Sequence, residues 1–343
     1  MSERPVLSIL IITHNQLPLL KRCLESVLKQ DIRVPYEIIV SDDRSNDGTD
    51  LFMKNFQNSS DNLISIKYVR CNSDDCNPTC ISDRCGWNKL NAYNQCQGVF
   101  FVNIDADDYL RSNDIYQKQI EMLEKHPECS MCMQRILSIK ENEPFDKGFV
   151  WPQSQILRDG VVIDKETFIL GNLRGLNQGY MIRRRPKDDM RQLYGKLFDD
   201  AVITYHHLQY GPIVFIDRAD YVWVHYSKSI SHSVPVDDSK ILYGTLPLFH
   251  AVLFPSMRTL FIENGLSSLI QMLKYSPEYP IISDGYIDYF RQFPFFIIKY
   301  YIENQHSLIH KIRFLYIFYL LLFLNKYQIK SKVALLLAYK SLI

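Results

Sequence analysis

Apolar stretches of strand length alternate with amphipathic stretches of helix length in the first part of the chain. The apolar runs lie at residues 5–13, 36–40, 64–69 and 99–104. After the first run, leucines and a valine recur at helical spacing over residues 17–28, and Asp47-Gly48-Thr49 opens a second helical stretch. Strands that alternate with helices predict parallel β-α-β units with right-handed crossovers. The predicted fold class is therefore α/β, with a mostly parallel central sheet flanked by helices.

The pattern is less regular after the fourth apolar run. A helix is expected at residues 113–126 and a strand at 129–138. Over residues 140–178 the periodicity weakens and proline, glycine and charged residues increase, which predicts a mobile segment over the strand ends. The elements expected beyond it are a strand at 180–182, a helix near 198–209 and short strands at 213–216 and 221–225.

The C-terminal part of the chain differs in composition, and we predict two regions, residues 1–240 and residues 241–343. From Tyr286 onward, eight lysines and arginines stand against Asp288 and Glu303, mixed with many aromatic and aliphatic residues. This composition favours helices lying in the plane of a membrane surface, where cations meet anionic lipid. A helical bundle packed on the first region explains the same residues. The longest apolar run, Phe314–Leu324, has 11 residues, whereas a membrane-spanning helix needs roughly 20, so no transmembrane helix is predicted.

Charge and cysteine content narrow the class of protein. The 343 residues include 39 Lys and Arg and 38 Asp and Glu, for a net charge of +1, so a nucleic-acid partner is not expected. The first apolar run starts too early, and is followed too soon by His14 and Asn15, to be the core of a signal peptide. We therefore expect a cytoplasmic protein, peripheral on the inner face of the membrane if the C-terminal region docks there. Its eight cysteines are expected to be reduced.

The segment FFVNIDADDYL places three carboxylates, Asp105, Asp107 and Asp108, directly after a buried strand. Like charges this close repel each other unless a cation lies among them. Mg²⁺ or Mn²⁺ prefers such oxygen ligands and can neutralise a diphosphate leaving group. The alternative is an acidic helix N-terminus, which the helix dipole tolerates.

Three segments in order, PVLSILIITHNQ, IIVSDDRSNDGT and GVFFVNIDADDYL, resemble the family 2 glycosyltransferases, which have the GT-A fold and bind nucleotide sugars. The resemblance covers roughly residues 5–235. It implies that Asp43 binds the base or ribose of the donor nucleotide, with Thr13 at the same site. Asp105 and Asp107 match the family's D-x-D motif, so Asp105 would lie towards the ribose and diphosphate and Asp107 would bind the metal. Arg84 matches a basic residue that reaches the nucleotide.

The segment LFDDAVITYHHLQYG resembles the family's acidic pair, which stands eleven residues before a glycine; Asp200 and Gly211 keep that spacing. The resemblance implies that Asp200 is the general base that deprotonates the acceptor hydroxyl in an inverting displacement. Asp199 is the second choice for this role. An acidic helix N-terminus is the structural alternative for both residues.

The chain departs from the family's pattern at two positions. Arg44 stands where glycine is usual, so the local turn is expected to differ. In YVWVHYSKSIS, which resembles the family's Y-R-x-H-x-x-S-x-S, Trp223 stands where arginine is common, and His225 keeps the histidine position. Neutral imidazole is a competent ligand for Mn²⁺, so His225 is a candidate ligand of the metal or phosphate; a structural histidine closing a strand is the alternative.

Four cysteines, Cys71, Cys76, Cys80 and Cys85, lie within fifteen residues. Four thiolates suit a structural Zn²⁺ site, although the spacing is not that of paired C-x2-C ligands. Reduced, partly buried thiols are the default interpretation.

The sequence thus predicts a metal-dependent, inverting glycosyltransferase that uses Mn²⁺ or Mg²⁺. It would move a hexosyl or hexosaminyl group from a nucleoside diphosphate sugar to a hydroxyl of a glycan or lipid-linked glycan, in surface polysaccharide synthesis. A non-catalytic nucleotide-sugar-binding or scaffolding protein on the same fold is the alternative, and its expected mark would be erosion of the D-x-D or the acidic pair. Both are intact. Glycoside hydrolysis by two carboxylates would not need the residues around Asp43.

Overall fold

The chain divides into two compact units, Met1–Ser229 and Ile230–Ile343. The computed structural model describes residues 4–57, 64–71, 81–170, 173, 179–185 and 200–226, all in the first unit, without the side chains of residues 57, 81–83, 169–170, 200–202 and 205. Nothing described tests the predicted boundary after residue 240, or the membrane-surface prediction for residues 241–343. Among the described residues, no helix is long and apolar enough to cross a bilayer.

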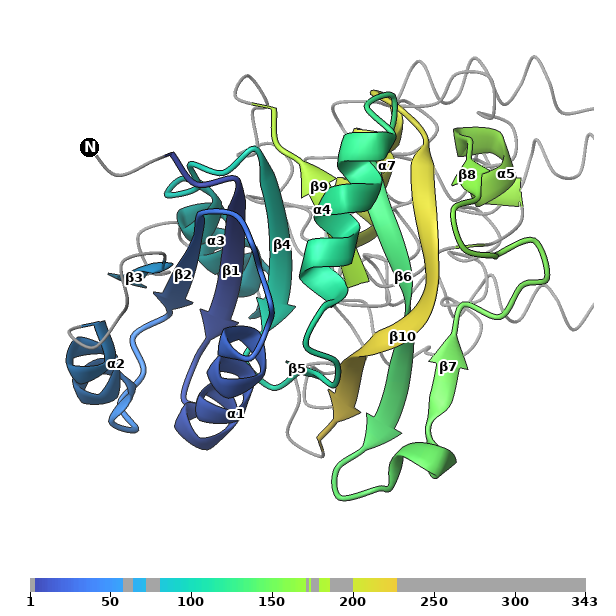
Figure 1. The fold of residues 1–343 in the computed structure, drawn as a ribbon. Helices are drawn as coiled ribbons and strands as arrows, with labels where there is room; N and C mark the ends of the chain where they lie inside the picture. The colour runs from blue at the N-terminus through green and yellow to red at the C-terminus, as the bar shows by residue number, and fades with distance from the viewer. Residues whose placement is uncertain are drawn as a thin grey trace, which may run out of the picture. The chain divides into compact units, whose positions relative to one another are not determined.

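Helices and strands alternate through the described part of the chain (Figure 1). The strands are β1 (Leu7–Thr13), β2 (Tyr36–Asp42), β3 (Ile64–Arg70), β4 (Phe100–Asp105), β5 (Tyr109–Leu110), β6 (Met131–Lys140), β7 (Phe149–Trp151), β8 (Val162–Ile163), β9 (Tyr180–Arg183) and β10 (Ile213–His225). The helices are α1 (Leu17–Leu28), α2 (Thr49–Gln57), α3 (Ile81–Tyr93), α4 (Ile115–Lys125), the 3-10 turn η2 (Phe145–Lys147), α5 (Lys165–Leu170) and α7 (Asp200–Leu208).

The strands form one mixed sheet in the order β3-β2-β1-β4-β9-β6-β10-β5, with β7 paired to β6 and β8 to β10. Strands β3, β2, β1 and β4 are parallel to one another. The short β9 runs antiparallel to both β4 and β6, so β6, and β10 parallel to it, point the same way as β1. The chain adds strands in opposite directions from β1, and ligands bind outside the carboxyl ends of strands at such a switch point.

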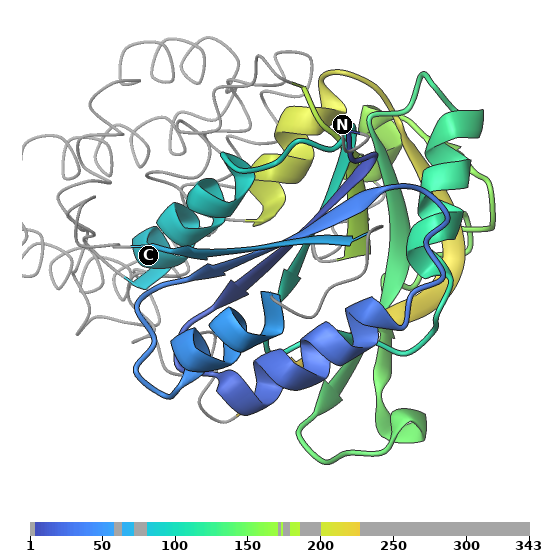
Figure 2. The same cartoon turned by 60° about the vertical axis from the view of Figure 1, so that its left-hand side comes forward.

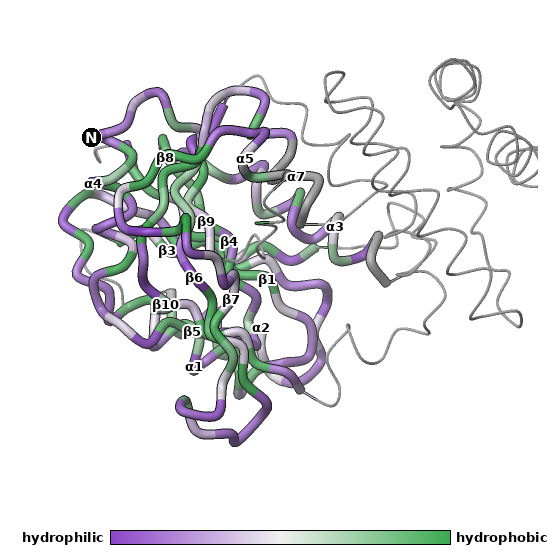
Figure 3. The backbone as a smooth tube through the Cα atoms, turned by 90° about the vertical axis from the view of Figure 1, so that its right-hand side faces the viewer, coloured by the Kyte–Doolittle hydropathy of each residue, from purple (hydrophilic) through white to green (hydrophobic). Residues whose placement is uncertain are grey.

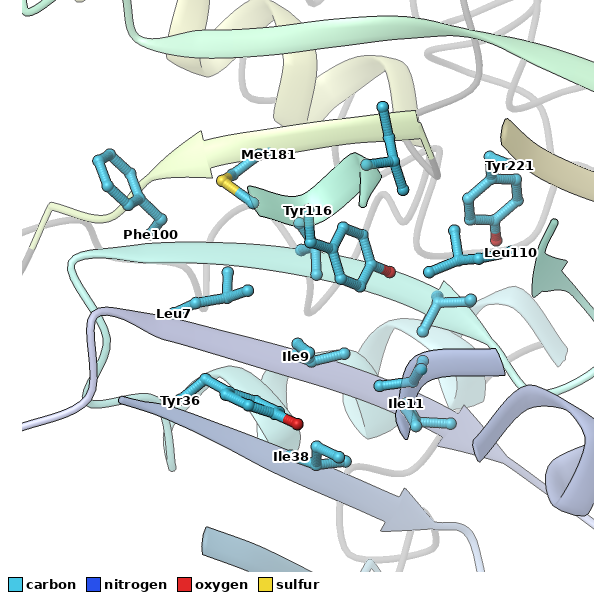
Figure 4. Packing of buried hydrophobic residues seen from close by; sticks show 14 of the residues in the cluster. Leu7, Ile9, Ile11, Tyr36, Ile38, Phe100, Leu110, Tyr116, Met181 and Tyr221 are labelled. Carbon is cyan, nitrogen blue, oxygen red and sulfur yellow. The ribbon is translucent and has the colours of Figure 1, made fainter. Parts of the chain in front are cut away.

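The two faces of the sheet are covered by different helices (Figure 2). Strands β1 and β2 are buried along their whole length, which is why they are almost uninterrupted apolar runs rather than alternating ones. Alternate residues such as Leu7, Ile9 and Ile11 join the core that includes residues of α1 and α4. Figure 4 shows these side chains together with Tyr116 of α4 and Tyr221 of β10. On the other face, α3 lies against β1 and β2, and the apolar strands lie inside the more polar loops (Figure 3).

The predicted strand and helix order is confirmed for the first four strands, and three details differ. The two short strands predicted at the end of the domain are one bent strand, β10, whose pairing with β6 shifts register between Ile216 and Tyr221. Helix α3 begins where only a cysteine-rich loop was expected, because its sequence has little amphipathic periodicity. The segment predicted to be mobile includes η2, β7, β8 and α5.

Candidate active site

The predicted donor-site residues meet at the carboxyl edge of β1, β2 and β4. The register pairs Thr13 with Asp42 on β2 and Ile12 with Asp105 on β4. Asp43 donates its backbone N–H to the carbonyl of Thr13 at 3.1 Å. Residues from three separate segments of sequence therefore lie at one edge of the sheet, at the switch point between β1 and β4 (Figure 1).

Asp43 is held by Arg84 of α3, while the predicted roles of both residues at the nucleotide stay predictions. Arg84 donates to Asp43 Oδ2 through Nε at 3.1 Å and Nη2 at 2.7 Å. Asp43 is 4% exposed, and the side chain of Arg84 is 33% exposed. Both nitrogens contact the same oxygen, while Arg44 approaches the other oxygen at 4.0 Å. A planar guanidinium next to a carboxylate can orient the carboxylate towards a nucleoside.

The turn after β2 adopts the conformation that the family's glycine would favour. Arg44 has φ +54°, in the left-handed region where non-glycine residues are uncommon. The buried Asp42 stabilises the turn by accepting hydrogen bonds from the backbone and hydroxyl of Ser45 and from Tyr68. Ser45 Oγ in turn accepts a bond from the backbone of Asn15 at 2.7 Å. The loops after β1 and β2 are thus joined, and these hydrogen bonds stabilise the turn in which Arg44 has a left-handed conformation.

The acidic segment after β4 places its three carboxylates in three different environments. Asp105 lies 3.4 Å from Nζ of Lys89, a lysine of α3 that is only 4% exposed. Asp107 has a half-buried side chain, and burial together with the charge of Asp105 raises the pKa of Asp107 to about 6. The charged form of Asp107 is therefore costly to hold without a cation.

Asp108 has a structural role that the sequence did not reveal. It is 1% exposed and accepts hydrogen bonds from the Tyr221 hydroxyl at 2.7 Å and from the Val224 backbone at 3.0 Å. Burial and the neighbouring acids raise the pKa of Asp108 well above its ordinary value. This residue ties the acidic segment to the end of β10. Tyr221, four residues before His225 and the first residue of that motif, was the signal available in the sequence.

His225 closes β10 at the same edge of the sheet. Its Nε2 lies 2.7 Å from Ser138 Oγ on β6, and its ring stacks obliquely on Trp223 with a centroid separation of 3.9 Å. Val224, the residue before His225, is bonded to Asp108. The backbone that leads into His225 therefore lies beside the acidic segment in space. The predicted ligand role of His225 stays a prediction.

Sequence comparison decides the family. A model of glycosyl transferase family 2 matches residues 8–184, which are 177 of the 343 residues. The chain belongs to glycosyl transferase family 2. The enzyme class predicted from the motifs, glycosyltransferase, is confirmed at the level of the family.

Relatives of this family 2 chain include one curated enzyme and several solved structures. The GalNAc(5)-diNAcBac-PP-undecaprenol beta-1,3-glucosyltransferase of Campylobacter jejuni is 35% identical over 108 residues, which cover 32% of this chain and 31% of that protein. The chain therefore matches about a third of the length of this relative. The structure of S. aureus TarS 1-349 in complex with UDP-GlcNAc has a TM-score of 0.56 at 16% identity, covering 84% of this chain and 80% of that chain. TarS 1-349 without a named ligand gives a TM-score of 0.53. These structures confirm the GT-A fold.

The family 2 site fits a divalent cation held by few protein ligands. Among the described residues, three candidate ligand atoms come within 4.8 Å of one another at His126, Glu128 and Cys129, at the amino end of β6, and not at Asp107 and His225. Mg²⁺ is commonly bound by one or two carboxylates plus substrate phosphates and water. The raised pKa of Asp107 marks a carboxylate whose charge a cation would stabilise.

Two predictions fall largely on residues that the structure leaves undescribed. Asp199 lies outside the described residues, and Asp200 is described only as the first backbone position of α7. Cys76 and Cys80 also lie outside. Burial raises the pKa of Cys85 to about 12, which disfavours the thiolate that zinc binds. The described residues therefore do not support the zinc prediction.

Proposed function

We propose that this protein transfers a hexosyl or N-acetylhexosaminyl group from a nucleoside diphosphate sugar to a hydroxyl of a glycan acceptor, with inversion at the anomeric carbon. The observation that carries the proposal is that two groups of side chains lie at one edge of the sheet. One is the Asp43–Arg84 ion pair, and the other is the acidic segment with Asp105 and Asp107. A nucleoside diphosphate needs both, since it has a hydrogen-bonding base and ribose at one end and a diphosphate at the other.

The donor would lie across the switch point between β1 and β4. Asp43, fixed by Arg84, accepts hydrogen bonds from the base or ribose, and Thr13 borders the same site. Thr13 is 2% exposed, and its hydroxyl is without a hydrogen-bond partner in the described structure. An atom of the nucleotide sugar or a water molecule can supply the missing hydrogen bond. Asp105 lies between Lys89 and the expected position of the diphosphate.

A Mn²⁺ or Mg²⁺ ion would be held by Asp107, with Asp105 beside it and His225 as a candidate third ligand. When bound, the ion would neutralise charge on the departing diphosphate. The chain's own contribution is to hold two carboxylates near each other at a fixed edge of the sheet. Lys89 offsets part of the charge on Asp105, which leaves Asp107 as the carboxylate that most needs a cation.

The acceptor hydroxyl requires a base. In the proposed displacement Asp200 takes the hydroxyl proton, and the acceptor oxygen forms a bond to the anomeric carbon. As this bond forms, the bond from that carbon to the diphosphate oxygen breaks, and the nucleoside diphosphate leaves with the electron pair. Asp199 is the alternative base. The Campylobacter relative is named for a glycan on a polyprenyl pyrophosphate, and we propose an acceptor of this lipid-linked class, used at the cytoplasmic membrane surface.

The test is a thermal-shift panel of UDP-, GDP- and dTDP-sugars with and without Mn²⁺, using the full chain. A ligand at 100 times its dissociation constant stabilises a protein by about 2.7 kcal/mol, which gives a clear shift in Tm. We expect a metal-dependent shift with one nucleotide class and its loss in Asp107→Ala. Unchanged Tm values with every donor would overturn the proposed donor site.

A further inference from the structure

The strands beyond the donor site carry an aromatic face that the proposed donor chemistry does not use. The register pairs Trp223 of β10 with Ser138 of β6, and Ser138 with Phe149 of β7. Paired residues project to the same face of a sheet, and so do residues two apart on one strand. Trp223, His225, Ser138, Phe149 and Trp151 therefore share one face, which we call the aromatic face.

Ring contacts agree with this placement. Trp223 and His225 have ring centroids 3.9 Å apart, Phe149 and Trp151 have centroids 6.3 Å apart, and Ser138 bonds to His225 between the two pairs. The intervening residues of β6 and β10, with Tyr226 directly after β10, form a separate buried apolar cluster on which Val150 packs: Leu137, Ile139, Val222, Val224 and Tyr226.

Solubility alone would favour polar side chains on the face of these strands that is not covered by the buried cluster, but this face carries aromatic side chains. Phe149 is 49% exposed, and Trp151, Trp223 and His225 are half-buried. An exposed group of aromatic side chains marks an interaction site more often than it serves stability. Two of the chain's three tryptophans lie here, and one of them, Trp223, stands where the family commonly has arginine.

The aromatic face begins beside the acidic segment. Val224, between Trp223 and His225, donates its backbone N–H to Asp108, the residue after Asp107. From that point the face extends across β6 to β7, away from the nucleotide side of the sheet (Figure 1). A molecule that lies on it would have one end near the carboxylates proposed to hold the metal and diphosphate.

The chemistry of the face fits a pyranose ring. A sugar has an apolar C–H surface, which stacks on aromatic rings, and polar edges, which bond to groups such as Ser138 Oγ. A bilayer is a poorer fit, because the turn that joins β6 to β7 carries Glu141, Glu143 and Asp146 against Lys140 and Lys147. Anionic lipid attracts clusters of cations rather than such a mixture.

We propose that the aromatic face is the acceptor platform, with Trp223 and His225 beside the reacting sugar and Phe149 and Trp151 stacked on a more distant sugar of the same glycan. This inference rests on the proposed function, because it names where the acceptor of that reaction binds. It also explains Trp223: at a site that stacks a sugar, an aromatic ring replaces the family's cation.

The experiment measures oligosaccharide binding to the full chain with UDP and Mn²⁺ present, by tryptophan fluorescence. The probes are free N-acetylgalactosamine, N-acetylglucosamine and glucose oligosaccharides. Phe149→Ala is expected to weaken binding roughly tenfold, the upper range for one aromatic contact, and Phe149→Tyr to restore it. Phe145→Ala is the matched control, because Phe145 is 48% exposed in η2 and lies outside the strand rows. It is expected to bind as the unsubstituted chain does.

Equal affinities of Phe149→Ala and the unsubstituted chain would overturn the acceptor platform. So would the failure of every oligosaccharide to bind while the donor thermal shift persists, and that result would leave the proposed donor site standing. Loss of the donor shift with oligosaccharide binding still dependent on Phe149 would overturn the proposed function instead. The last measurement is cosedimentation with phosphatidylglycerol vesicles. If both Phe145→Ala and Phe149→Ala bind vesicles less well while their oligosaccharide affinity is unchanged, the aromatic face binds the membrane. That result would overturn the acceptor platform.

Discussion

The nucleotide side of the sheet and the aromatic face are built in opposite ways. On the nucleotide side, two carboxylates have cationic partners from another segment: Asp43 has Arg84, and Asp105 has Lys89. On the aromatic face, a large apolar side chain such as Phe149 is half exposed, on strands whose other face is buried. A charged ligand such as a nucleoside diphosphate needs a fixed polar frame, whereas the proposed acceptor platform presents rings, the most exposed of them on the short strand β7.

The contrast depends on the acidic segment, which lies between the two regions. Asp107 faces the proposed diphosphate site, and Asp108 bonds to the strand that carries Trp223 and His225. Two adjacent carboxylates thus differ: Asp107 is proposed to bind the cation, and Asp108 positions the end of β10. Substitutions at these residues and at Arg84 and His207 test the division, beginning with the largest expected effect.

Asp107→Ala removes the carboxylate proposed to bind the cation. Changes to groups that merely support metal ligands typically cost 10–100-fold in activity, so we expect a loss of more than roughly 100-fold in kcat/KM with the Tm of the unliganded protein unchanged or raised. The measurement is sugar transfer at saturating Mn²⁺. The control is Asp31→Ala, whose side chain is 58% exposed and pairs with Arg33 alone among the contacts described. Activity within threefold of the unsubstituted chain would show that the metal is held elsewhere.

Asp108→Ala should act on stability first. It leaves the buried Val224 N–H and Tyr221 hydroxyl without their acceptor, and we expect a loss of about 2 kcal/mol in the free energy of unfolding. Asp108→Asn is the matched variant, since its amide oxygen can accept from Val224 and its NH₂ can donate to the Tyr221 oxygen. It should retain most of the stability, as measured by urea denaturation. Equal losses in the two variants would contradict the positioning role.

The first half of the sheet could be predicted because its information is local. Each of β1, β2 and β4 is a continuous apolar run, and the functional residue follows its own strand directly, as Asp43 and Asp105 do. Helix α3 was missed because its buried residues include polar ones, with Asn88 and Lys89 bonded to strand ends. Such a helix has weak apolar periodicity, so only the tertiary contact reveals it.

The second half of the site could not be predicted because its partners are far apart in sequence. Asp108 and Tyr221 meet across 113 residues, and the aromatic face depends on the register of β10, β6 and β7. A shift by one residue would turn Trp223 and Phe149 to the opposite face. The turn at Arg44 shows the converse: the sequence departs from the family's glycine, yet the hydrogen bonds of Asp42 and Ser45 stabilise a backbone conformation that glycine would favour.

Arg84→Met tests whether the nucleotide side needs its ion pair. Asp43 would lose two N–H donors and its orientation towards the nucleoside. We expect the KM for the donor sugar to rise about tenfold, equivalent to about 1.4 kcal/mol, while oligosaccharide binding stays unchanged. Arg84→Lys should fall between, because an ammonium cannot supply the same pair of bonds. Arg33→Met, at an exposed ion pair, is the control; a KM for Arg84→Met equal to that of this control would remove Arg84 from the donor site.

The smallest expected effect concerns the layer beneath the nucleotide side. His207 of α7 is fully buried against Phe101 of β4, and neither ring nitrogen has a hydrogen-bond partner in the described structure. Burial lowers the pKa of His207 to about 3, whereas an unfolded histidine titrates near 6.5. Below pH 6.5 the unfolded chain therefore binds a proton at His207 that the folded chain does not bind. The contribution of neutral His207 to the free energy of unfolding is complete above pH 6.5 and is lost as the pH falls towards 3.

Between pH 7.5 and 5.5 this difference amounts to about 1 kcal/mol of unfolding free energy. His207→Leu should remove that part of the pH dependence, and His206→Gln, at the adjacent half-buried position, should keep it. The measurement is urea denaturation at the two pH values. If both variants show the same pH dependence as the unsubstituted chain, then the acid sensitivity of this layer comes from other groups and α7 packs more loosely on β4 than the structure has it. If the dependence disappears in His207→Leu alone, the helix that begins at the proposed base Asp200 is fixed to the strand that ends at Asp105, because only close packing keeps an imidazole uncharged at pH 5.5.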